Sequence, residues 1–126
     1  MNVLLVGLGG AAGAIARYLL GGIVQERSGS LFPWGTLAVN VLGCLVMGLL
    51  AGLADARGFM TPGTRALLVV GVLGGFTTFS AFGNETMNLL LDRDLTRAAL
   101  NVGLNVVLGV AAVWAGRAAI LLVKGA

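Results

Sequence analysis

The sequence predicts an all-α membrane protein of four transmembrane helices, with a break in the third, that assembles as an antiparallel (dual-topology) homodimer. Three observations lead to this prediction. Hydrophobic residues make up 58% of the 126 residues and charged residues only 10%, which is outside the range of water-soluble domains. The apolar residues form blocks long enough to cross a bilayer. The basic residues are divided evenly between the two ends of these blocks.

The predicted spans are single helices joined by short polar loops. Because a bilayer core is crossed by roughly 20 apolar residues, crossings fill the chain, and we expect one transmembrane domain in the cell (inner or plasma) membrane. The loops read QERSGSLFP, DARGFMTPG and DRDLT, where charges, Gly and Pro gather. The first block lacks the basic start of a signal peptide and is expected to stay in the mature protein. The predicted spans cover residues 3–24, 34–54, 65–91 and 97–123.

The first span contains Gly9 and Gly13, and the second contains Gly48 and Gly52. Each pair is four residues apart and therefore lies on one helix face, which predicts close helix packing. Arg17 lies toward the far end of the first span, where its guanidinium is expected to extend to the membrane interface.

Amide and hydroxyl side chains lie within the second and fourth spans. Thr36 and Asn40 are four residues apart on one face, and so are Asn101 and Asn105. Interhelical hydrogen bonding is one interpretation of these residues. The lining of a polar path made of neutral donors is the other. The lone Cys44 is interpreted as a packing residue.

The third span contains the stretch GGFTTFSAF, residues 74–82. Gly74 and Gly75 weaken a helix, and the hydroxyls of Thr77 and Thr78 compete for backbone hydrogen bonds. An unwound backbone in a membrane survives only if it is buried in protein or bound to something that satisfies it. Freed carbonyl oxygens are ligands for a hard cation such as Na⁺, whereas tight packing through glycine is the alternative.

Two phenylalanines and one carboxylate follow the break. Phe79 and Phe82 lie three apart on one face, and Glu85 is the only acidic residue deep within a span. A stripe of this kind is typical of packing, yet the positive edge of a phenyl ring can also contact a small anion without binding it too tightly. An intramembrane carboxylate must be paired, protonated or in contact with water.

The loop charges do not favour either orientation. With four spans, each end of the bundle collects four basic residues, which predicts insertion in both orientations and an inverted homodimer. A weak orientation bias that this count misses is the alternative. The residues at one end are Arg57, Arg65, Arg117 and Lys124, and those at the other are Arg17, Arg27, Arg93 and Arg97.

The sequence has few residues for catalysis. It has no His, a single Cys and neither a catalytic triad nor a phosphate-binding loop. We therefore expect no enzyme activity and no nucleic-acid partner. A proton-coupled exporter of the small multidrug resistance type is the main alternative, but that family works through a glutamate in the first span, and this first span has none. A structural subunit without transport activity would leave the interrupted helix unexplained.

Several motifs together resemble the fluoride ion channel family, also called CrcB or Fluc. They are GTLAVN at 35–40, GGFTTFSAF at 74–82 followed by Glu85, and GGAAGAIARY around Arg17. The resemblance covers essentially the whole chain. It implies a dual-topology homodimer in the lipid bilayer with two antiparallel fluoride pathways and a structural Na⁺ at the interface. It also implies passive electrodiffusion that exports toxic fluoride from the cytoplasm.

The resemblance assigns roles by position. It places Phe79 and Phe82 as the pore phenylalanines and Asn40 as the pore amide. The backbone carbonyls of Gly74 and Thr77 would bind Na⁺. Thr36, Ser80 and Glu85 would lie along the adjoining polar track. One position departs from the family pattern, because Ala81 replaces a residue that commonly carries a hydroxyl. The fourth-span positions of Asn101 and Asn105 also vary among relatives.

Overall fold

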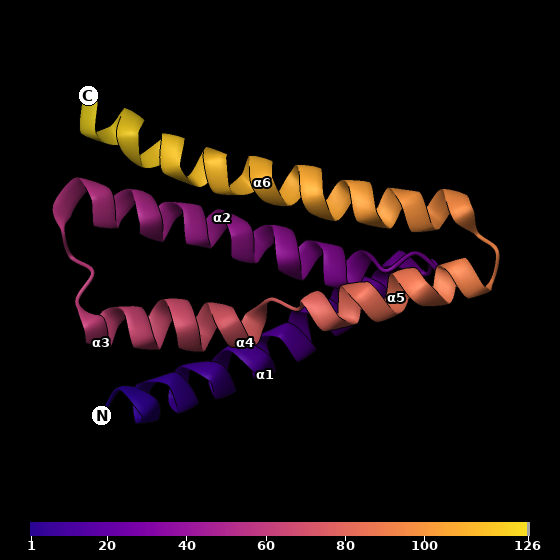
Figure 1. The fold of residues 1–126 in the computed structure, drawn as a ribbon, viewed down its shortest axis with the longest axis horizontal. Coiled ribbons are helices and arrows are strands. Elements are labelled where there is room, and N and C mark those ends of the chain that lie inside the picture. The colour runs from indigo at the N-terminus through magenta and orange to yellow at the C-terminus, as the bar shows by residue number, and fades with distance from the viewer. Residues whose placement is uncertain (126) are drawn as a thin grey trace.

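The structure is a computed structural model that describes residues 1–125. In these residues the chain is all-helical, and its long helical stretches lie alongside one another with both termini at the same end of the bundle (Figure 1). Four stretches are long and apolar enough to cross a membrane. Each predicted span lies within one of them, and the helices continue into the polar flanking residues. These stretches are Asn2–Ser28, Trp34–Arg57, Pro62–Leu91 and Leu95–Gly125.

The first two stretches are the continuous helices α1 (Asn2–Ser28) and α2 (Trp34–Arg57). Both end at a glycine in the left-handed conformation, Gly29 with φ 57° and Gly58 with φ 61°, a conformation that other residues rarely adopt. Gln25 fixes the turn between them. Its amide nitrogen donates to the carbonyls of Ser30 and Phe32, and its amide oxygen accepts the N–H of Gly35.

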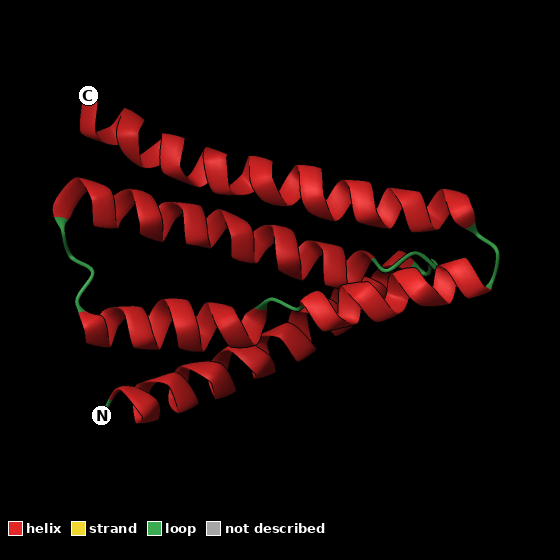
Figure 2. Cartoon of the chain, viewed as in Figure 1, coloured by secondary structure: helices red, strands yellow, loops and turns green. Residues whose placement is uncertain are grey.

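The third stretch changes helix type and then breaks. It consists of α3 (Pro62–Thr64), the π-helical segment η1 (Arg65–Leu73), α4 (Gly74–Phe76) and α5 (Phe79–Leu91). Thr77 and Thr78 between α4 and α5 are extended, with ψ 155° and ψ 111°, and Figure 2 shows this short loop inside the bundle. The predicted interruption is confirmed. It lies at the two threonines, however, and Gly74 and Gly75 remain helical.

Glycines bring the helices into backbone contact. A Cβ at Gly9 or Gly13 would meet backbone atoms of η1, and one at Gly48 would meet the Val113 carbonyl of α6 (Leu95–Gly125). The predicted close packing is therefore confirmed at these glycines, where a side chain would keep the helices apart. The interior is small, and Val39 and Asn101 are the two largest fully buried side chains of the described residues.

Candidate functional site

Asn40 of α2 satisfies the backbone of the break. Its side-chain oxygen accepts the Thr78 N–H at 2.8 Å, and its side-chain nitrogen donates to the Thr78 carbonyl at 3.1 Å. The Thr78 hydroxyl in turn accepts the N–H of Ala81 at 3.2 Å and caps α5. An extended residue at membrane depth needs such partners because no water replaces the lost helical bonds. This one side chain, on a neighbouring helix, therefore provides the hydrogen bonds that stabilise the break.

A series of side-chain hydrogen bonds connects Asn40 to the carbonyl of Phe82 in α5. Asn40 donates to the Asn105 oxygen at 3.2 Å, and Asn105 donates to the Asn101 oxygen at 3.0 Å. Asn101 then donates to the Thr86 hydroxyl at 2.9 Å, and Thr86 donates to the Phe82 carbonyl at 2.8 Å. These bonds hold α5 against α2 and α6. Thr86 was not predicted as part of the site, although its spacing of four from Phe82 allows this bond on a helix.

The break opens onto a cavity of about 440 Å³, which we call the Phe cavity. The rings of Phe79 and Phe82 lie on it with centroids 5.5 Å apart, at an angle of 51°. Phe79 is 82% exposed, so this face of the chain is open. None of the lining residues within 1–125 is charged, and the polar ones are amides and hydroxyls together with Cys44. The site residues on this cavity are Asn40, Gly74, Thr77, Thr78, Phe79, Phe82 and Asn105.

A second cavity of about 460 Å³, the Arg cavity, lies on the other side of Thr78. It is lined by Arg17, Thr36, Ala81 and Glu85 as well as Thr78. The Thr36 hydroxyl donates to Glu85 Oε1 at 2.7 Å. The other carboxyl oxygen, Oε2, is buried and has no hydrogen-bond partner within residues 1–125. Ala81 lies four residues before Glu85 and has no hydroxyl that could donate to this oxygen.

Two details differ from the sequence-based expectations. Arg17 does not extend to the interface, because its Nε donates at 3.0 Å to the Gly75 carbonyl, next to the break. Thr36 and Asn40 share a helix face as predicted but line different cavities. Thr78 lines both and joins them.

The predicted site residue Ser80 lies outside both cavities. Ser80 is exposed, and it lines neither the Phe cavity nor the Arg cavity. Its hydroxyl lies 3.4 Å from that of Thr78. Ser80 is therefore connected to the two cavities through Thr78 alone.

The backbone around the break offers oxygen ligands for a cation. In a continuous helix the Gly74 and Thr77 carbonyls would accept the N–H groups of Thr78 and Ala81. Those N–H groups bond instead to Asn40 and to the Thr78 hydroxyl. Both carbonyl residues line the Phe cavity. Carbonyl oxygens are ligands of the kind that a hard cation takes, and no cluster of His, Cys, Asp and Glu that could hold a metal is found in residues 1–125.

Comparisons with known proteins identify the family. Residues 4–117 match the family model described as CrcB-like protein, Camphor Resistance (CrcB). A fluoride-specific ion channel, FluC, of Methylobacillus flagellatus is 49% identical over 116 residues, covering 91% of both chains. Proteins with the same name from Opitutus terrae and Geobacter sulfurreducens are 48% and 46% identical and cover 92% and 91% of this chain, and 89% and 93% of their own lengths.

These relatives are named as ion channels, in agreement with the prediction that the chain is not an enzyme. Together with the four apolar helical stretches, they identify a multi-pass protein of the cell membrane. The chain belongs to the CrcB family.

Proposed function

We propose that this protein is a fluoride channel that exports cytoplasmic fluoride by passive electrodiffusion. The observation that carries the proposal is the Phe cavity, where Phe79, Phe82 and the Asn40 amide meet without a charged lining residue. Ring edges and neutral donors attract a small anion, and the lack of a fixed cation lets it leave again. The names of the relatives support fluoride as the anion.

The hydrogen-bond pattern suggests how the anion binds. Both N–H groups of the Asn40 amide are engaged, one with the Thr78 carbonyl and one with the Asn105 oxygen. The longer of these bonds is the 3.2 Å bond to Asn105. An anion between the phenyl rings takes over this donor, and the Asn105 oxygen is displaced. The exchange replaces a neutral hydrogen bond by a charge-assisted one, which is stronger.

The Arg cavity is the proposed approach to this position. Of the five N–H donors of an arginine, Arg17 uses one for the Gly75 carbonyl, and the others can attract an anion. The polar track beyond it consists of Thr36 and Glu85, with Ser80 next to Thr78 at its edge. Thr78, which lines both cavities, connects the approach to the Phe cavity.

A second, inverted copy of the chain completes the site in this proposal. The open Phe cavity with its 82% exposed Phe79 supports an additional protein surface there. Arg17 donates to a carbonyl next to the break and is therefore no longer counted at an end of the bundle. One end then holds four basic residues and the other holds three (Arg27, Arg93 and Arg97), which is still close to balance. In the inverted dimer, the Gly74 and Thr77 carbonyls of both copies would hold a structural Na⁺, which would join the two breaks.

Fluoride efflux from proteoliposomes tests the proposal. Vesicles loaded with potassium fluoride are diluted into fluoride-free buffer, valinomycin is added as a K⁺ shunt, and a fluoride electrode records release. Efflux that needs the shunt but no proton carrier is expected. Efflux that runs only with proton movement would instead favour the proton-coupled exporter, which the named relatives do not favour. No efflux beyond that of empty vesicles would refute channel function.

A further inference from the structure

A surface groove lies away from both cavities, between the last turns of α1, the first turns of α2 and the middle of α6. Its volume is about 660 Å³. Its floor is apolar and includes Ile23, Leu37, Val41 and Leu108. The α2 residues that line it are Trp34, Leu37, Ala38 and Val41, whereas those that line the Phe cavity are Asn40, Gly43, Cys44 and Met47. The groove is therefore separate from the proposed pore.

One end of the groove is basic. Arg27, in the last turn of α1, is the only charged residue of the described chain that lines it. Arg27 is exposed and takes part in no salt bridge among residues 1–125. Trp34 lies on the same groove and is 42% exposed. Tryptophan is enriched at the level of lipid head groups, so this end of the groove matches the membrane interface and its other end matches the acyl region.

We propose that the groove binds a phospholipid with an anionic head group. The lipid phosphate contacts the Arg27 guanidinium beside Trp34, and one acyl chain lies along Leu37, Val41 and Leu108. An unpaired guanidinium at the interface complements an acidic head group, and a basic residue near the membrane surface favours acidic lipid by about fivefold. The apolar floor gives the acyl chain an ordered contact surface. In an inverted dimer each leaflet would contain one such site.

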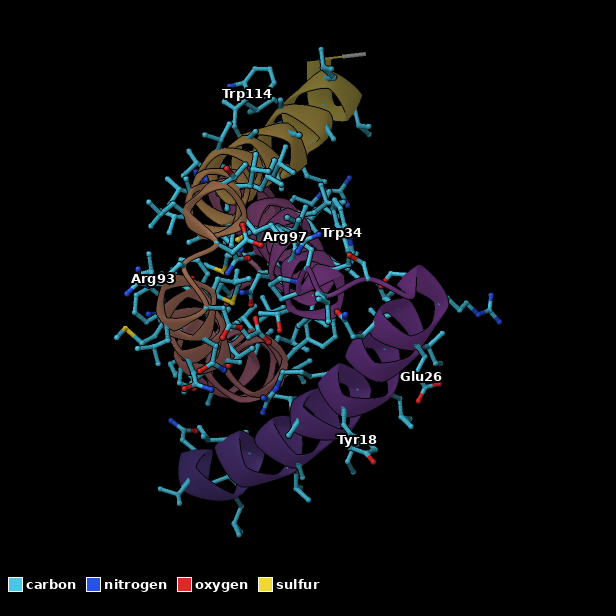
Figure 3. All side chains as sticks on the ribbon, turned by 90° about the vertical axis from the view of Figure 1, so that its right-hand side faces the viewer. Tyr18, Glu26, Trp34, Arg93, Arg97 and Trp114 are labelled. Carbon is cyan, nitrogen blue, oxygen red and sulfur yellow. The ribbon has the colours of Figure 1, made fainter. Side chains whose placement is uncertain are left out.

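Two other charged residues near this end of the bundle help to distinguish a specific lipid site from a general attraction to acidic lipid. Glu26 precedes Arg27 on α1 but does not line the groove, and Figure 3 shows its side chain pointing away from the bundle. Arg93 lies at the same end of the bundle but on the opposite side from Trp34 (Figure 3). Arg93 also takes part in no salt bridge of the described residues. It is therefore a matched control for Arg27.

Native mass spectrometry of the delipidated protein in detergent tests the proposal. Phosphatidylglycerol and phosphatidylcholine with the same acyl chains are added, and glycerol 3-phosphate serves as a probe without acyl chains. We expect about a fivefold preference for phosphatidylglycerol, which Arg27→Gln abolishes and Arg93→Gln retains. Leu108→Phe, which fills the groove floor, should weaken binding of both lipids. Glycerol 3-phosphate should not bind.

Four results would overturn the proposal. The first is equal binding of the two lipids by the unmodified protein. The second is an equal loss of preference in Arg27→Gln and Arg93→Gln, which would indicate a diffuse charge effect. The third is binding of glycerol 3-phosphate as strong as that of lipid. The fourth is lipid binding that Leu108→Phe leaves unchanged. Either of these last two results would place the acyl chain outside the groove.

Discussion

Replacing Asn40 by leucine removes the side chain that holds the break open. The substitution deletes three hydrogen bonds, two with the Thr78 backbone and one with Asn105. At about 0.6 kcal/mol for an average side-chain bond within a membrane, these contribute about 2 kcal/mol. The Thr78 N–H is then left without its partner, which costs about 1–3 kcal/mol more. Asn40→Leu should therefore destabilise the protein by about 3–5 kcal/mol.

Asn101→Leu is the matched control. Asn101 is fully buried and also loses its side-chain bonds, those to Thr86 and Asn105. However, Thr86 still donates to the Phe82 carbonyl, and Asn105 still donates to the main-chain oxygen of residue 101. Because no backbone group is orphaned, we expect a loss of only about 1 kcal/mol. Reversible unfolding in mixed detergent and dodecyl sulfate micelles measures the free energy of unfolding of both variants. Equal losses, or less than 1 kcal/mol for Asn40→Leu, would refute the role assigned to Asn40.

Three further substitutions test separate parts of the account. Gly13→Ala should lower the unfolding temperature because the new Cβ meets the backbone of η1. Gly7→Ala, whose Cβ meets nothing within 4 Å, should raise it slightly. Equal shifts in the two variants would contradict the close packing of α1 on η1. Ala81→Ser places a hydroxyl one helical turn before Glu85, whose Oε2 has no hydrogen-bond partner within residues 1–125, and should stabilise by about 1 kcal/mol; an unfolding temperature no higher than that of the unmodified protein would contradict this expectation. Phe82→Ile should reduce fluoride efflux while size-exclusion chromatography shows an unchanged assembly, and unaltered efflux would return Phe82 to a packing role.

The fold follows from composition and glycine spacing, because apolar length and small-residue contacts are local properties of the sequence. The exact position of the break does not. Gly74 and Gly75 are the weakest helix formers of the stretch, yet they are helical and Thr77 and Thr78 are extended. The partner that decides this, Asn40, lies 38 residues away. Local propensity contains no information about such a contact.

The same limit applies to the site residues. Arg17 was expected to extend to the interface because its position in the helix suggested it, but a freed carbonyl 58 residues away accepts its N–H. The spacing of Thr36 and Asn40 correctly placed them on one face, whereas their separation into two cavities depends on how α5 follows the break. The polar residues of the fourth span were recognised, but the order of their hydrogen bonds depends on Thr86, on another helix.

Fluoride efflux from mixtures of orientation-locked variants tests the central claim most directly. One variant carries Glu26→Lys and Thr96→Lys, and the other carries Asn2→Lys and Val3→Lys, so that exposed lysines at opposite ends of the bundle fix opposite orientations. Each variant expressed alone should give little efflux, and co-expression of the two should restore efflux toward that of the unmodified protein. Full efflux from either variant alone, with a single orientation established by cysteine labelling, would contradict the inverted dimer and the shared fluoride site.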